Sequence, residues 1–104
     1  MPARRVLPLR RAVQTFDLHH AEQSYQVSVG YFDDLTPAEV FVNGAKVGSG
    51  IEAIARDAAV LLSIAMQFGV PLDVMRGAVT RDASGSPASV IGAVVDKLVE
   101  EREC

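Results

Sequence analysis

The residues whose types and spacing best suit chemistry lie in a glycine-rich turn ahead of a long apolar segment. The turn combines the cation Lys46 with glycines on both sides of Ser49. Free N–H groups and the helix dipole attract anions at the start of a helix, so the turn predicts a site for a nucleotide or another phosphate. Arg81 would contribute a second positive charge. The candidate ligand-binding residues are Lys46, Gly48, Ser49, Gly50 and Arg81.

The same turn also has a purely structural interpretation. Ser49 can cap the helix that follows, and Glu52 can reach back to the N–H of Ser49 in a capping box. Such a box uses the donors that an anion would need, and the turn lacks the spacing of a Walker loop or a dinucleotide fingerprint. Both interpretations stay open from the sequence.

A second group of candidates suits contact with a partner. Four arginines bracket the short apolar stretch 6–9 ahead of an otherwise acidic chain. They predict a flexible basic arm, residues 1–11, that docks on an acidic partner; a frayed, solvated tail is the alternative. Asp82 joins this group because it lies in a predicted loop, where binding residues are common. The candidate partner-binding residues are Arg4, Arg5, Arg10, Arg11 and Asp82.

The remaining chemistry-bearing residues do not form a recognisable catalytic or metal-binding set. His19 and His20 are adjacent, so on a strand they point to opposite faces and cannot share a metal ion. Cys104 is the only cysteine, which excludes an internal disulfide and a multi-thiolate zinc site within one chain. We therefore assign no catalytic residue and no metal ligand, and expect a chain that is not an enzyme on its own.

Composition limits the kinds of partner. The 104 residues suffice for one domain, and the net charge of -3 argues against a general nucleic-acid binder, which needs a basic face. The chain shows no secretory signal, and its longest apolar segment is too interrupted to span a bilayer. We expect a cytoplasmic protein without membrane or nucleic-acid partners.

Hydrophobic periodicity predicts an α+β fold. Alternation of apolar and polar residues indicates strands at 12–20, 24–32 and 39–44, joined by short connections that favour an antiparallel meander. Helices follow: a main one after Ser49 that stops at Gly69, a short one over 71–79, and a third that is capped by Ser86 and carries an apolar stripe to Val99. The prediction is a three-stranded meander and three helices packed on one face of the sheet, as a single domain over residues 12–104.

Several stretches, in this order, resemble one protein family. They are residues 10–16 (RRAVQTF), 23–33 (QSYQVSVGYFD), 37–42 (PAEVFV), 46–49 (KVGS) and 65–72 (AMQFGVPL). Together they resemble the TSCPD domain, the C-terminal region of adenosylcobalamin-dependent (class II) ribonucleotide reductases. The motif that names the domain falls at residues 84–88 (SGSPA), where only Pro87 is kept. Ser86 stands in place of the cysteine, so no thiol role is carried over.

The resemblance implies a stand-alone accessory or regulatory domain linked to deoxynucleotide synthesis. It implies a ribonucleotide reductase as partner and adenosylcobalamin only through that partner, with no cofactor bound by this chain. Two other functions stay open: a small nucleotide- or phosphate-binding module, and a structural homo-oligomer. The homo-oligomer is suggested by the main helix, which is apolar almost all round and so needs cover on more than one side.

Overall fold

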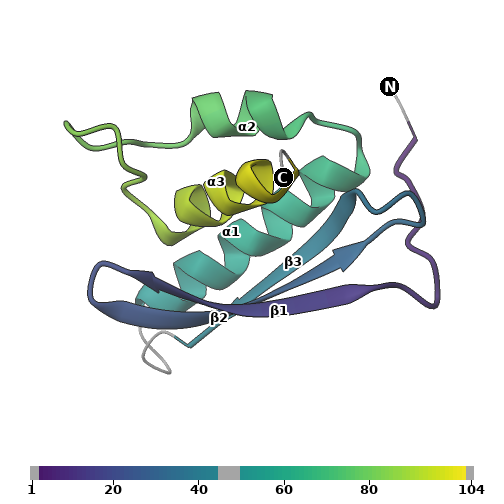
Figure 1. Ribbon diagram of the computed structural model, residues 1–104, viewed down its shortest axis with the longest axis horizontal. Helices are drawn as coiled ribbons and strands as arrows, with labels where there is room; N and C mark the ends of the chain where they lie inside the picture. The colour runs from purple at the N-terminus through teal and green to yellow at the C-terminus, as the bar shows by residue number, and fades with distance from the viewer. Residues whose placement is uncertain (1–2, 45–49, 103–104) are drawn as a thin grey trace.

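The computed structural model describes residues 3–44 and 50–102, which form three strands followed by three helices (Figure 1). All three helices lie on the same side of the sheet. The predicted α+β fold is confirmed. The elements are β1 (Val13–His20), β2 (Gln23–Tyr31), β3 (Pro37–Asn43), α1 (Gly50–Gln67), α2 (Leu72–Ala78) and α3 (Val90–Arg102).

The sheet is an antiparallel meander in the order β1-β2-β3. His20 pairs with Gln23, so β1 and β2 are joined by a turn of only two residues, Ala21 and Glu22. Both turn residues have positive φ angles, 49° and 67°, as two-residue hairpins of the favoured hand require. The strands predicted at 12–20 and 24–32 leave residues 21–23 as their connection, which is one residue too long because β2 begins at Gln23.

Alternation places one face of the sheet in the core. Tyr25, Val27 and Val29 of β2 are buried, while the residues between them are more exposed or small. Val40 and Val42 of β3 continue the buried face, and four valines and Leu98 of α3 complete an aliphatic core. The opposite face of the sheet carries polar residues together with Phe41, which is exposed.

The main helix, α1, lies along the edge strand β3 and satisfies part of its backbone. The Ser63 hydroxyl accepts a hydrogen bond of 2.8 Å from the N–H of Val40, and Gln67 Nε2 donates to the carbonyl of Ala38 at 3.0 Å. Both side chains are buried. Because an uncovered edge strand invites pairing with other chains, α1 protects β3 through these two polar residues.

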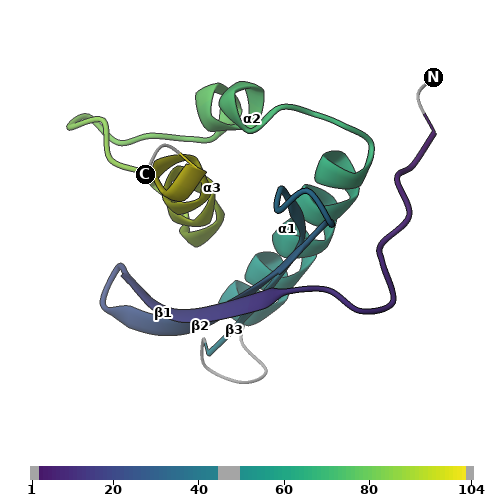
Figure 2. The ribbon, with the colours of Figure 1, turned by 45° about the vertical axis from the view of Figure 1, so that its right-hand side comes forward.

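The second and third helices form a further layer. α3 contacts α1 and β1, whereas α2 packs on α3 at a distance from the sheet in both ribbon views (Figures 1 and 2). The predicted cap of α3 was wrong: Ser89, not Ser86, accepts the N–H of Gly92 at 3.1 Å. Ser86 instead belongs to the preceding loop, where its carbonyl accepts the N–H of Asp82.

Candidate functional site

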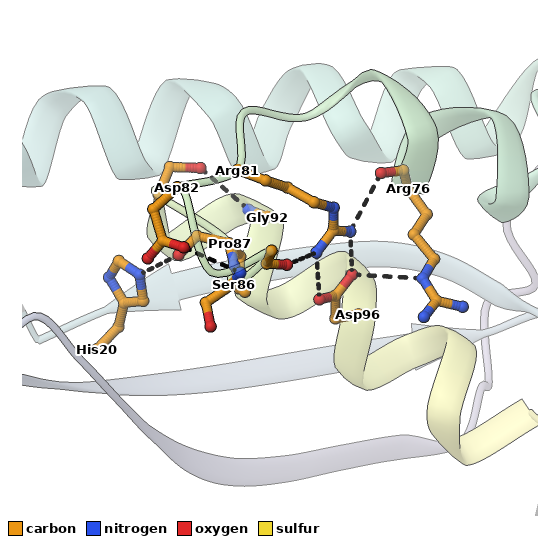
Figure 3. Close-up of polar contacts among 10 residues, drawn as sticks. His20, Arg76, Arg81, Asp82, Ser86, Pro87, Gly92 and Asp96 are labelled. Carbon is orange, nitrogen blue, oxygen red and sulfur yellow. Dashed lines mark hydrogen bonds and ion pairs between the residues drawn. The ribbon is translucent and has the colours of Figure 1, made fainter.

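The loop between α2 and α3 is built around Arg81 (Figure 3). Its guanidinium donates two hydrogen bonds to Asp96 of α3, at 3.0 and 2.7 Å, and further bonds to the carbonyls of Gly85 and Arg76. Such a two-pronged arrangement is the strong form of an arginine–carboxylate pair. The Arg81 hydrogen bonds lower the pKa of Asp96 and Asp96 raises the pKa of Arg81. The pair fixes the base of the loop.

The tip of the same loop is organised by Asp82. Its Oδ1 accepts hydrogen bonds from the hydroxyl and N–H of Ser84, at 2.6 and 2.9 Å, and from the N–H of Ser86 at 3.1 Å. These bonds, the Ser84 hydroxyl first, lower the pKa of Asp82. Gly85 takes φ +88°, which suits glycine. The tip is therefore an ordered turn with exposed side chains.

The loop is also tied to the sheet. His20, the last residue of β1, donates from Nε2 to the carbonyl of Pro87 at 3.0 Å, as Figure 3 shows. Beside this contact is a hollow of about 290 Å³ that is lined in part by His20, Tyr25 and Ile54. Pro87 and Ala88 thus lie where the hairpin, α1 and α3 approach one another.

A larger open cleft of about 990 Å³ lies at the opposite end of the helices. Its walls come from the segment before β1, the β2–β3 turn, the junction of α1 and α2, and the end of α3. Apolar lining is supplied by Phe32, Met66, Leu72 and Leu98. In size and in its mixed lining the cleft is typical of a ligand site or a partner-docking site.

Charged and polar groups surround this apolar lining. The Arg5 guanidinium lies 3.8 Å from the centre of the Phe32 ring and forms a 3.1 Å ion pair with Asp34. Hydrogen bonds from the Thr36 hydroxyl and N–H, together with Arg5, lower the pKa of Asp34 to about 2. Arg102 lies on the α3 side and pairs with Asp73 at 3.0 Å. The cleft therefore presents cations from two directions.

Tyr31 contributes a further polar group to the cleft wall. Its hydroxyl donates to Gln14 Oε1 at 2.8 Å. Burial, and then the negative charge of Glu101, raise the pKa of the Tyr31 phenol. Tyr31 therefore remains a neutral hydrogen-bonding group at physiological pH.

The predicted ligand-binding residues are not brought together among the described residues. Lys46, Gly48 and Ser49, and with them the proposed capping box, lie outside the described residues. Gly50 is the exposed first residue of α1. Arg81 lies in the α2–α3 loop, with its guanidinium held by Asp96. A phosphate site at this turn stays a prediction.

The predicted partner-binding arginines divide into two kinds. Arg4 donates to Gln67 Oε1 at 2.6 Å, Arg5 pairs with Asp34, and Arg11 donates to Glu39 Oε2 at 2.5 Å. These three contact the body of the domain, and the flexibility of the arm stays a prediction. Arg10 is exposed and makes no recorded polar contact with the rest of the described chain.

Sequence reasoning missed the cleft and the partner of Arg81. The cleft joins side chains from both ends of the chain, such as Arg5 and Arg102, which no local pattern connects. Asp96 lies 15 residues after Arg81, too far along the chain for a local pattern to pair the two side chains. The signal available in the sequence was the position of Asp96, an acidic residue two positions before the buried Leu98. This signal for a partner of Arg81 is weak.

Neither a metal site nor a membrane-spanning helix is found in the ranges 3–44 and 50–102. Over these residues no group of three or more His, Cys, Asp or Glu side chains is placed to hold a metal ion. Within the same ranges no helix is long and apolar enough to cross a membrane. The features that remain for function are the α2–α3 loop, the cleft and the exposed surface.

A three-stranded meander covered on one face by helices, with an ordered loop at one end and a cleft at the other, defines the chain as a small mixed α+β domain. Residues 3–100 match the TSCPD domain family. The chain therefore belongs to the TSCPD domain family.

One curated relative is a much larger protein. The chain is 40% identical over 74 residues to a vitamin B12-dependent ribonucleotide reductase of Rhodopirellula baltica. The match covers 71% of this chain and 7% of the reductase. No solved structure matches the chain.

Proposed function

We propose that the chain is an accessory or regulatory domain that acts on a ribonucleotide reductase and has no catalytic activity of its own. The observation that carries the proposal is the 40% identity to a segment of a vitamin B12-dependent reductase. Because that segment is 7% of the reductase, nearly all of the reductase lies outside the part that this chain resembles. The proposed role places the chain in deoxynucleotide synthesis and in the cytoplasm.

The α2–α3 loop supports contact with such a partner. Arg81 and Asp82 hold its backbone, while Ala83 and Ser84 at the tip are exposed. A loop that is ordered before binding loses little conformational entropy when a partner covers it. The loop tip is therefore our choice for the reductase contact.

The cobalamin is assigned to the partner. The proposal gives this chain no part in binding the cobalamin.

The test uses the purified chain and the purified cobalamin-dependent reductase of the same organism, with adenosylcobalamin, ribonucleotides and a dithiol present. We expect a stoichiometric complex, a change in the reductase rate or in its response to effectors, and no reduction by the chain alone. Ala83→Trp should weaken the complex, whereas Phe41→Glu, on the other face of the sheet, should not. Failure to form any complex, or reduction by the chain alone, contradicts the proposal.

As a second candidate we propose a nucleotide-binding module, and the cleft favours it. The apolar wall beside Phe32 suits a flat base, and Arg5 and Arg102 supply cations for phosphate groups. The cleft is a second location besides the turn at Lys46, where a phosphate site stays a prediction.

Thermal unfolding with added nucleotides tests this candidate. A nucleotide present at 100 times its Kd should stabilise the chain by about 2.7 kcal/mol. Arg102→Gln should reduce the shift, and Arg56→Gln, an exposed arginine outside the cleft, should leave it unchanged. No shift with any nucleotide at millimolar concentration would remove the candidate.

A further inference from the structure

The outward face of α1 is apolar and open to solvent. Ile54 and Leu61 are 73% and 68% exposed, and they lie two helical turns apart on one side of the helix. Asp57 lies between them, exposed and without an ion-pair partner among the described residues. An apolar surface of this kind marks a contact site for another molecule. The exposed large apolar residues of α1 are Ile51, Ile54, Val60 and Leu61.

A second exposed apolar stretch, with the opposite charge, lies in the segment before β1. Val6 and Leu9 project into solvent, and the neighbouring Arg10 makes no recorded polar contact. In a polyproline II conformation, which has three residues per turn, Val6 and Leu9 share one side and lie about 9.3 Å apart, and seven helical residues span about 10.5 Å. The spacing from Val6 to Leu9 therefore matches the spacing from Ile54 to Leu61.

We propose that this chain forms a two-fold dimer in which residues 6–10 of each copy lie on the outward face of α1 of the other copy. Val6 and Leu9 contact the apolar side chains around Ile54 and Leu61. Arg10 pairs with Asp57 across the interface, which gives each unpaired charge a partner of opposite sign. The proposal does not depend on the reductase.

The position of residues 6–10 allows each copy to place this segment on α1 of the other copy. The N–H of Arg5 donates to the carbonyl of Gln67 at 2.7 Å, which holds the segment at the C-terminal end of α1 (Figure 2). If two α1 helices lie antiparallel, the end of one is beside the start of the other. Each segment then reaches the Ile54 half of its partner's helix, and the contact closes as a dimer instead of continuing as a fibre.

Sedimentation equilibrium of the full chain tests this proposal from about 1 μM to about 1 mM, a range that covers weak and moderate dimers. We expect a mass that rises towards twice 11.1 kDa. Leu61→Glu should leave a monomer that unfolds at the wild-type temperature, because Leu61 is exposed within one copy. Phe41→Glu, which also places a glutamate at an exposed apolar position, should keep the dimer.

A charge exchange tests the pairing of the segment with the helix. Arg10→Glu and Asp57→Arg should each raise the dimer Kd about tenfold or more, and the double variant should return it to within about threefold of the wild-type value. A wild-type monomer at every concentration overturns the proposal, even if another protein binds this face. A dimer that survives Leu61→Glu, or a double variant that does not recover, also overturns it.

Discussion

α1 buries an ordinary apolar stripe of Ala55, Ala59, Leu62 and Met66, but its two flanking sides depart from the usual arrangement of a surface helix. Towards β3, the polar residues Ser63 and Gln67 are buried and hydrogen-bonded, whereas on the outward side Ile54 and Leu61 are exposed. An ordinary amphipathic helix buries its apolar stripe and exposes its polar one. The difference shows that the residue types on each side of α1 suit what lies beside that side. The edge strand β3 needs hydrogen-bond partners, and the outward apolar face needs a further surface to cover it.

The largest effect should come from a matched pair of adjacent leucines. Leu62 is 6% exposed in the core, while Leu61 is 68% exposed on the outward face. We expect Leu62→Ala to lower the free energy of unfolding by about 2–5 kcal/mol, because it leaves a cavity. Leu61→Ala should change it by less than about 0.5 kcal/mol at concentrations where the chain is monomeric. Urea unfolding measures both, and equal effects would break the contrast between the two sides.

A smaller effect should follow from removing a buried hydroxyl. Ser63→Ala leaves the N–H of Val40 without its 2.8 Å acceptor, and an unsatisfied buried donor costs about 1–3 kcal/mol. Val60→Ala, on the outward side, should stay within about 0.5 kcal/mol of the wild-type stability. If Ser63→Ala were as stable as the wild type, the polar side of α1 would not be holding β3.

The corrected cap of α3 gives a third expectation. Ser89→Ala removes the acceptor for the N–H of Gly92 and should cost about 0.5–2 kcal/mol. Ser86→Ala removes no cap and should cost less. The two variants, compared by thermal unfolding, separate the observed start of the helix from the one that the sequence suggested.

Acid should weaken the loop cluster in a defined direction. The Arg81 hydrogen bonds lower the pKa of Asp96, so this pair stabilises the fold above the ordinary aspartate value of about 3.9. That contribution is lost as the pH falls through the lowered pKa. Asp96→Asn should reduce stability at neutral pH and flatten its fall in acid, and Arg81→Gln should reproduce both changes. Unfolding curves between pH 7 and pH 2 that keep the wild-type slope in both variants would contradict the pairing.

Local patterns in the sequence were enough for the strands and the helices. Alternation of apolar and polar residues identified β2, and Gly69 marked the end of α1. These signals work because strand and helix periodicities act over a few residues. Because the main helix is apolar almost all round, the sequence also indicated that the sheet alone could not cover this helix.

Contacts between segments far apart in the chain could not be predicted from local sequence patterns. Ser86 followed by Pro87 fits the pattern of a helix start. In the structure the N–H of Ser86 donates to Asp82 within a loop turn, and Ser89 is the residue that caps α3. Ser63 and Gln67 lie in the helix predicted after Ser49, but no local pattern marks them as buried. Their burial depends on the backbone of β3, 23 and 29 residues away in the chain.

Isotope-filtered NMR on a mixture of labelled and unlabelled chains tests most directly what covers the outward face of α1. We expect intermolecular contacts from the methyl groups of Val6 and Leu9 to those of Ile54 and Leu61, at concentrations where the dimer is populated. Leu62, buried within one copy, should show none. If Ile54 and Leu61 showed no intermolecular contact near 1 mM, or contacted only residues outside the 6–10 segment, the proposed dimer would be contradicted.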